Sequence, residues 1–317
     1  MRSSHCLALA VSLALLSACA QSPKGSAATA GDANAVETAA PTPASDAAKA
    51  WLADVDAIAT AADNAGRRRV IEQQLESLGL AWQAMPFESE HGPGENLIAK
   101  VSGNPEAPLL LLGAHSDRVG EGKGATDNAS GSAVVLELAE RFKQAPLDNH
   151  RVSVAFWDLE ERGLLGAHAF IAKGGPAPAQ YVNFDVFGWG DTVWMMTPDP
   201  AHPLTTASQA AANDAGLHLS AGEQYPPTDH RAFLKAGWPA VSYSLVGQDE
   251  IGAILAAYAG NKPEATPKVM HVIHSERDTL AQLDPNAAAR GIDAIEAALR
   301  QWDAGAGSTN AAAASND

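Results

Sequence analysis

The chain has 317 residues, with 37 Asp and Glu against 21 Lys and Arg, and carries a formal net charge of −16. Such a surface repels nucleic acid, so we exclude a nucleic-acid partner, and it leaves carboxylates available for cations. Both cysteines, Cys6 and Cys19, lie near the N-terminus. Because Cys6 would leave with a signal peptide and Cys19 would carry lipid, catalysis by a cysteine nucleophile is excluded as well.

Residues 1–18 have the pattern of an export signal. Arg2 precedes an apolar run over 7–16 that is too short to span a bilayer. The following Leu-Ser-Ala-Cys, which ends at Cys19, resembles the lipobox of bacterial lipoproteins, in which the cysteine becomes the first residue and is acylated. We therefore expect an exported protein anchored through Cys19, in the outer membrane facing the periplasm because no Asp follows the cysteine. An ordinary signal peptide that contains a cysteine is the alternative.

Composition divides the remainder of the chain into three parts. Residues 19–49 are mostly small or polar and cannot bury enough surface to offset the entropy of ordering, which predicts a disordered tether. Residues 50–303 suit one α/β domain. Residues 304–317, rich in Ala, Gly, Ser and Asn, predict a disordered tail.

Helical and strand patterns alternate within the predicted domain. The helix predicted over 64–79 has a stripe of Val70, Ile71 and Leu75 and ends at a glycine. The continuous apolar run over 108–114 is typical of a central buried strand. In chain order we expect helix 64–79, strands 81–87, 95–102 and 108–114, helix 129–144, strand 151–157, helix 163–173, strands 180–187 and 239–245, and helix 284–303. This order predicts a three-layer α/β fold with a mixed, mostly parallel sheet and helices on both faces.

Histidines and carboxylates follow the predicted strands. In an open α/β sheet, ligands bind at the edge where the parallel strands end, so we expect these side chains to gather there. They are His115, Asp117, Asp127, Glu160, Glu161, Asp185, His274 and Asp278. Two imidazoles with several carboxylates form a ligand set that suits zinc. Taken singly, the same residues have simpler interpretations, since Glu160 and Glu161 could be an acidic helix start and Asp127 a helix cap.

Six motifs in a fixed order resemble peptidase family M28, the co-catalytic zinc aminopeptidases. They span most of residues 113–279. The motifs are Gly-Ala-His115-Ser-Asp117, Ala-Thr-Asp127-Asn-Ala-Ser-Gly, Asp-Leu-Glu160-Glu161-Arg-Gly-Leu-Leu-Gly, Asn-Phe-Asp185, Thr228-Asp229-His230-Arg-Ala-Phe and His274-Ser-Glu-Arg-Asp278-Thr. The order of all six, rather than any one of them, carries the resemblance.

The resemblance implies two zinc ions per chain. Asp127 would bridge the two ions. Glu161 and His274 would complete one site, and His115 and Asp185 the other.

The remaining roles also follow from the resemblance. Glu160 would act as the general base, and Asp117 would hold His115 in orientation. Tyr225, four residues before Asp229, would donate a hydrogen bond to the tetrahedral intermediate, although two prolines follow it here and the cysteine pair of related bacterial proteins is absent. Apart from the resemblance, we expect His230 to line the pocket and Asp278 to lie just behind the ligands, with a loop cap or a salt-bridge partner as the simpler interpretations of Asp278.

The resemblance implies a zinc-dependent exopeptidase that removes N-terminal residues from peptides. We expect the protein to act as a monomer. A carboxypeptidase and a glutaminyl cyclase on the same scaffold are rival enzymes. A non-catalytic surface lipoprotein that keeps a metal site is the rival outside enzymology. The M20 metallopeptidases share a related core but usually insert a dimerisation domain, for which this chain shows no pattern. Side-chain preference cannot be deduced from the sequence.

Overall fold

The computed structural model describes residues 43–314. The predicted signal, Cys19 and all but the end of the predicted tether lie outside these residues. Among the residues described, no helix is both long and apolar enough to cross a membrane.

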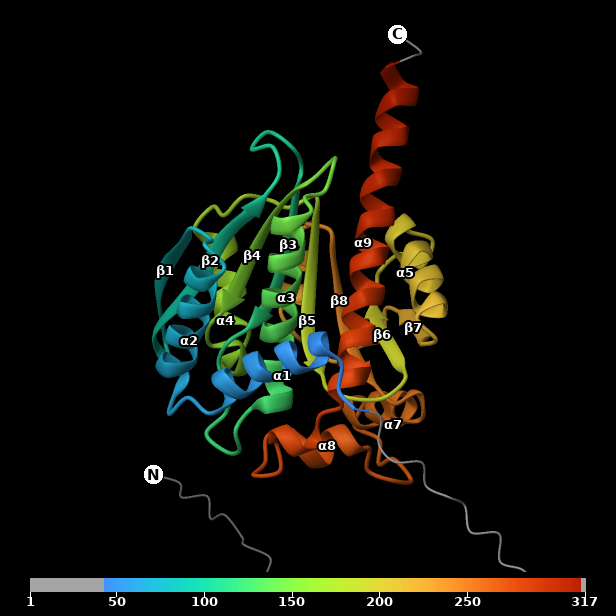
Figure 1. Ribbon diagram of the computed structural model, residues 1–317. Helices are drawn as coiled ribbons and strands as arrows, with labels where there is room; N and C mark the ends of the chain where they lie inside the picture. The colour runs from blue at the N-terminus through green and yellow to red at the C-terminus, as the bar shows by residue number, and fades with distance from the viewer. Residues whose placement is uncertain (1–42, 315–317) are drawn as a thin grey trace, which may run out of the picture. The chain divides into compact units, whose positions relative to one another are not determined.

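Eight strands in the described part of the chain form one mixed sheet (Figure 1). They are β1 (Trp82–Ser89), β2 (Gly92–Ser102), β3 (Leu109–His115), β4 (Arg151–Trp157), β5 (Gln180–Phe187), β6 (Thr192–Met196), β7 (His218–Gly222) and β8 (Ala240–Val246). Their spatial order is β1-β2-β4-β3-β5-β8-β6-β7. The four central strands β4, β3, β5 and β8 are parallel, whereas β1, β2 and β6 join the sheet in antiparallel pairings.

Helices cover both faces of this sheet (Figure 1). The described helices are α1 (Asp46–Ala59), α2 (Asn64–Ser77), α3 (Ser130–Gln144), α4 (Leu165–Ala172), α5 (Pro203–Asp214), α6 (His230–Lys235), α7 (Gln248–Tyr258), α8 (Lys268–Val272) and α9 (Pro285–Ala314). In β3, Leu110 and Leu112 join the core under α1, α3 and α9, while Leu109 and Leu111 join the core under α4 and α6. Burial on both faces explains the unbroken apolar run of β3, and the predicted three-layer fold class is confirmed.

The structure differs from the predicted domain bounds at both ends. Helix α1 begins at Asp46, inside the predicted tether, because the Ser45 side chain caps it by accepting the N–H of Ala48 at 3.1 Å. Helix α9 continues to Ala314, past the predicted helix end at 303. Alanine, the best helix former, is frequent in this segment and favours the extension.

Several elements have no counterpart in the sequence predictions. These are β6, β7, α1, α5, α6, α7 and α8. The two strands have five residues each, and α6 and α8 have six and five, so each is too short to establish a clear hydrophobic period. Helices α7 and α8 lie together at the lower end of the view in Figure 1, next to the site described below.

Candidate active site

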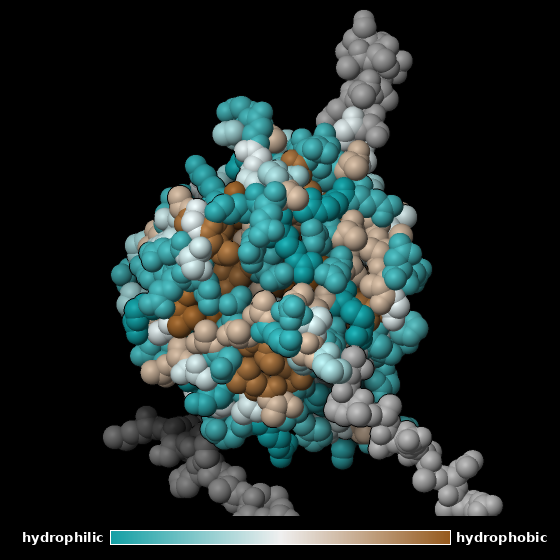
Figure 2. Space-filling view, viewed as in Figure 1, coloured by the Kyte–Doolittle hydropathy of each residue, from teal (hydrophilic) through white to brown (hydrophobic). Residues whose placement is uncertain are grey.

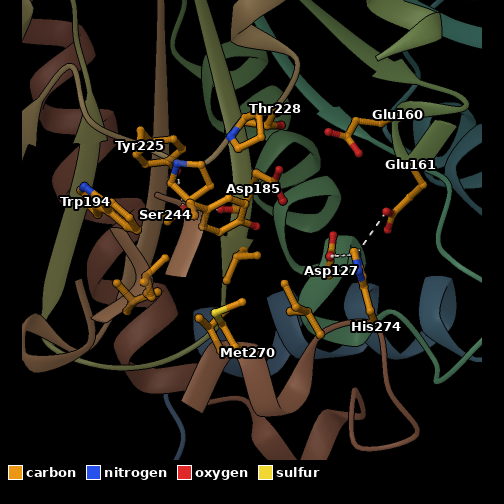
Figure 3. A pocket seen from close by; sticks show the side chains of 18 residues that line it. Asp127, Glu160, Glu161, Asp185, Trp194, Tyr225, Thr228, Ser244, Met270 and His274 are labelled. Carbon is orange, nitrogen blue, oxygen red and sulfur yellow. Dashed lines mark hydrogen bonds and ion pairs between the residues drawn. The ribbon is translucent and has the colours of Figure 1, made fainter. Parts of the chain in front are cut away.

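The predicted site residues gather at the edge where the parallel strands end. His115 is the last residue of β3 and pairs in register with Trp157 at the end of β4. Glu160 and Glu161 follow β4 in a short 3-10 turn (Glu160–Arg162), and Asp185 lies near the end of β5. Figure 3 shows both glutamates, Asp127, Asp185 and His274 converging on one opening.

His115 contacts two carboxylates of this group. Its Nε2 lies 3.1 Å from Oδ1 of Asp127 and 3.5 Å from Oδ1 of Asp185. The imidazole is 1% exposed, so its position is fixed by the surrounding protein. These three side chains form one half of the predicted ligand set.

His274 contacts the other half. Its Nε2 lies 3.1 Å from Oδ2 of Asp127 and 3.1 Å from Oε2 of Glu161. Asp127 therefore stands between two imidazoles, with one oxygen toward each. Ligand atoms of His115, Asp127 and Glu161 lie within 4.8 Å of one another, and Asp185 and His274 contact members of this group.

Asp117 connects the two sides of this cluster. Its carboxylate accepts the backbone N–H of Glu160 at 3.0 Å and that of Glu161 at 3.2 Å. Nδ1 of His115 lies 3.2 Å from the Asp117 carbonyl oxygen and 3.4 Å from its Oδ1. Asp117 thus holds the glutamate turn through its carboxylate and the imidazole ring through its carbonyl oxygen and Oδ1, in keeping with the predicted orienting role.

Two further residues hold the loop that carries Asp127. Asp278 accepts the N–H of Thr126 at 2.6 Å and that of Asp127 at 3.1 Å. Arg67 of α2 is fully buried and donates to the carbonyl oxygen of Ser116 at 2.7 Å and to that of Gly124 at 3.3 Å. The sequence predictions missed Arg67, because an arginine in a polar helix is usually exposed.

The backbone is strained beside the candidate ligands. Leu159, just before the glutamates, has φ 57°, Val186, just after Asp185, has φ 58°, and His274 itself has φ 55°. Non-glycine residues seldom adopt this left-handed conformation, and for a β-branched valine it is a genuine outlier. Strain of this kind is kept where the surrounding fold demands one orientation of a functional side chain.

The electrostatics of the cluster show an excess of negative charge. The pKa of Glu160 is raised well above its usual value by burial and by the charges of Asp229, Asp185 and Asp127, which outweigh His115. Contacts with Asp127 and Glu161 raise the pKa of His274 to about 10. Burial alone would lower the pKa of His115, but neighbouring carboxylates raise it well above 6.5.

The residues present fit divalent metal ions. Oε1 of Glu161 and Oδ1 of Asp185 are buried and, among the described residues, accept no hydrogen bond, although the latter lies near His115. Buried carboxylate oxygens left in this way need a cation. The donor set of two imidazoles and three carboxylates suits zinc, and the crowded negative charge that raises both histidine pKa values is what such ions would compensate.

A cavity of about 230 Å³ opens directly beside the cluster. Asp127, both glutamates, Asp185 and His274 line one end, as Figure 3 shows. The other end is lined chiefly by Trp194, Tyr225, Ile254, Tyr258, Met270 and Ile273, and we call the whole space the apolar cavity. In the surface view of Figure 2, polar residues cover most of the molecule and apolar residues form small patches between them.

Tyr225 and His230 form part of the wall of this region. The Tyr225 hydroxyl is hydrogen-bonded to the Ser244 hydroxyl, which donates to the carbonyl oxygen of Asp185. The Tyr225 ring packs on Trp194, with centroids 4.7 Å apart, and meets the buried ring of His230 edge-on at 5.7 Å. Tyr225 lines the cavity, whereas His230 lies behind it and supports the tyrosine; the predicted contact of Tyr225 with an intermediate stays a prediction.

Asp229 is a buried carboxyl group to which the sequence predictions gave no role. It is 0% exposed, and neither of its oxygens has a hydrogen-bond partner among the described residues. Burial and the charges of Asp185 and Asp117 raise its pKa well above the usual value, against the opposing effect of His115. Its place in the motif Thr228-Asp229-His230 was the available signal, but spacing alone did not show that it faces the cluster.

Several curated proteins are similar in sequence to this chain. The chain is 28% identical over 278 residues to leupeptin-inactivating enzyme 1 of Streptomyces exfoliatus, covering 82% of this chain and 61% of that protein. It is 34% identical over 127 residues to the probable lipoprotein aminopeptidase LpqL of Mycobacterium tuberculosis, covering 38% and 23%. The chain therefore spans less than two thirds of the length of these relatives.

Solved structures share the fold. An aminopeptidase from Aneurinibacillus sp. strain AM-1 superposes with a TM-score of 0.64 at 15% identity, covering 80% of this chain and 93% of the other. A glutaminyl cyclase from Porphyromonas gingivalis gives 0.62 at 20% identity, covering 81% and 97%. The family model of peptidase family M28 matches residues 96–299, the region that contains every candidate ligand. The chain belongs to peptidase family M28.

Proposed function

We propose that this protein is a zinc aminopeptidase that removes an apolar N-terminal residue from peptides. One observation carries the proposal: Asp127 lies between His115 and His274, 3.1 Å from each, at the end of a cavity with an apolar far wall. The relatives that are named aminopeptidases and the family membership support it.

Two zinc ions would be held by five side chains. His115 and Asp185 would hold one ion, Glu161 and His274 the other, and Asp127 both. When bound, zinc supplies Lewis-acid polarisation of a peptide carbonyl and lowers the pKa of water. The opposed contacts of Asp127 support two sites rather than one.

Glu160 would move the proton. Burial and surrounding carboxylates raise its pKa, which favours a group that accepts a proton from the attacking water and returns it to the leaving amine. Figure 3 shows its carboxylate directed into the opening and apart from that of Glu161. Glu161 contacts His274 instead, so the adjacent glutamates have different surroundings and different proposed roles.

The shape of the cavity supports cleavage at the amino end. The apolar wall borders a cavity of about 230 Å³ next to the cluster, which suits an apolar side chain of the substrate. Carboxylates at the mouth suit a positively charged α-amino group better than the carboxylate that a carboxypeptidase must bind. A glutaminyl cyclase needs no water nucleophile, and the cluster with Glu160 supports hydrolysis, but structural likeness to cyclases makes that reaction an outcome to be tested.

The test uses a substrate panel on the zinc-loaded protein. We expect hydrolysis of Leu-p-nitroanilide and Leu-Gly-NH2, little hydrolysis of their N-acetylated forms, and weaker hydrolysis of Asp-p-nitroanilide. Trp194→Ala should lower kcat/KM for leucine substrates more than for alanine substrates. Trp82→Ala, outside the cavity, should leave the ratio of kcat/KM for leucine to that for alanine substrates unchanged. Release of C-terminal residues from N-acetylated peptides, or cyclisation of N-terminal glutamine without hydrolysis, would replace the proposal with the rival reaction.

We also propose that the protein is exported and lipid-anchored in the outer membrane, facing the periplasm, through Cys19 and acts as a monomer. The lipobox-like sequence supports the anchor, and one relative is named a probable lipoprotein aminopeptidase. Cys19→Ser should move the protein from the membrane to the soluble fraction and abolish labelling by palmitate. An unchanged distribution would favour an ordinary signal peptide.

A further inference from the structure

A second cavity adjoins the candidate metal cluster on another side. It has a volume of about 560 Å³, and Glu161 and His274 line both it and the apolar cavity. Its other walls include Asn64, Arg118 and Arg162. We call it the arginine cavity, because two arginines line it beside the candidate metal cluster.

Neither arginine is neutralised by an ion pair. Within residues 43–314, ion pairs of arginine involve Arg68, Arg141 and Arg300, but not Arg118 or Arg162. The chain has 37 acidic and 21 basic residues, and both arginines lie beside a carboxylate-rich site without a carboxylate partner among the described residues. Guanidinium groups bind carboxylates through paired, charge-assisted hydrogen bonds.

The fold holds Arg118 in place. The Asn64 side chain donates to the Arg118 carbonyl oxygen and accepts its N–H, both at 3.2 Å. The side-chain stem packs on Gly124, where a Cβ would come within 2.8 Å of the Arg118 Cβ. Nη1 donates to the Val119 carbonyl oxygen at 2.9 Å, whereas Nε is buried and has no hydrogen-bond partner among the described residues.

The acidic groups along the same cavity do not supply that partner. Asp117 accepts the N–H groups of the glutamate turn, and Glu161 contacts His274. Glu121 is exposed at the rim and makes no ion pair with either arginine. The charge of both arginines is therefore available to a ligand.

The position of the cavity relates it to the second residue of a peptide. Because Glu161 and His274 border both cavities, a peptide whose first side chain fills the apolar cavity extends past these residues into the arginine cavity. Successive Cα atoms are about 3.8 Å apart, so the second residue is the first to reach the arginines.

From this geometry we infer a carboxylate-binding subsite for the residue after the scissile bond, formed by Arg118 and Arg162. The inference rests on the proposed aminopeptidase activity and names its substrates: dipeptides, or peptides with an acidic second residue. The two sources share one chemistry, a carboxylate within one residue of the bond that is cut.

The experiment compares kcat/KM of the zinc-loaded full chain for three substrates that differ only in carboxylate. Leu-Gly has a free α-carboxylate, Leu-Glu-NH2 a side-chain carboxylate, and Leu-Gly-NH2 neither. We expect wild type to prefer one or both carboxylate substrates over Leu-Gly-NH2 by about tenfold, as one charge-assisted contact allows. In the double variant Arg118→Gln, Arg162→Gln this ratio should fall toward one.

Two matched variants separate charge at the site from charge elsewhere. Arg69→Gln removes an exposed arginine of α2 outside both cavities and should keep the wild-type ratio. Arg118→Lys retains charge without the planar fork and should keep part of the preference. Because the readout is a ratio, a general loss of activity in a variant cancels.

The outcomes also separate this inference from the proposed activity. Wild-type protein that hydrolyses Leu-Gly-NH2 without preferring either carboxylate substrate would overturn the subsite and leave the aminopeptidase proposal intact. A preference that persists in the double variant would overturn it too. If the wild-type protein hydrolysed none of the three substrates and did not hydrolyse Leu-p-nitroanilide either, the proposed activity itself would be refuted.

Discussion

Replacing Arg67 by Met removes a buried cation that joins the two loops carrying candidate ligands. The guanidinium donates to the carbonyl oxygens of Ser116 at 2.7 Å, Lys123 at 3.0 Å and Gly124 at 3.3 Å. Methionine fills similar space without donors, so these buried acceptors lose their partner. Ser116 follows His115 directly, and Gly124 begins the loop that leads to Asp127.

The magnitude follows from two opposing effects. Breaking a buried, hydrogen-bonded charge network costs about 3–5 kcal/mol, and each acceptor left unpaired costs about 1–3 kcal/mol. In the opposite direction, replacing the cation removes the desolvation cost of a buried charge, the same cost that lowers the pKa of Arg67 to about 10. We expect the free energy of unfolding to fall by about 3–5 kcal/mol, or the Tm by roughly 6–20 °C.

The assay is urea unfolding of the metal-free protein, followed by tryptophan fluorescence. Arg69→Met, on the same helix but exposed, is the matched control and should lie within about 0.5 kcal/mol of wild type. Arg67→Lys keeps the charge but not the fork and should lie between them. If Arg67→Met were as stable as Arg69→Met, the loops would not depend on the guanidinium and the reasoning would be refuted.

Three further predictions test other parts of the structure. Burial lowers the pKa of His230 to about 3, so the folded protein loses stability as pH falls from 6.5 toward 3, because the unfolded chain binds the proton first. In urea unfolding at pH 5, His230→Gln should remove about 2 kcal/mol of this loss. Equal pH slopes of stability in the variant and in wild type would count against the prediction. Because the pKa of His274 in the metal-free protein is about 10, zinc binding at pH 7 should release protons, seen by calorimetry in buffers of different ionisation enthalpy, and weaken as pH falls; binding without proton release would contradict this. Asp303 accepts the N–H of Asp148 at 2.9 Å and contacts Nδ1 of His150 at 2.7 Å. Asp303→Asn should therefore lower the free energy of unfolding by about 2–3 kcal/mol in the same urea assay. An unchanged urea midpoint would show that this end of α9 does not stabilise the domain.

The central sheet was predictable because burial on both faces leaves a strong pattern. Strands β3, β4, β5 and β8 match their predicted ranges within one residue, since each is rich in apolar and β-branched or aromatic residues and lies between polar loops. Strands β6 and β7 were not predicted, because five residues at one side of the sheet carry little periodicity. Helix α1 was missed because its alanines continue the composition of the preceding tether.

The candidate ligands were predictable for a related reason. His115, Asp127 and Asp185 lie at the ends of elements with clear patterns, and the family motif fixes their order. Arg67 and Asp229 were not assigned, because their roles depend on burial that only the folded chain shows. The wall of the apolar cavity includes residues of β6, α7 and α8, which the sequence did not predict, so this wall became visible only in the structure.

The most direct test of the account measures zinc content and turnover together in Glu160→Gln and Glu161→Gln. The account predicts that Glu160→Gln keeps two zinc ions per chain by elemental analysis and loses about 10²–10⁴-fold in kcat on Leu-p-nitroanilide. Glu161→Gln should lose zinc. Loss of zinc from Glu160→Gln, or wild-type turnover in that variant, would contradict the division of work between the two glutamates.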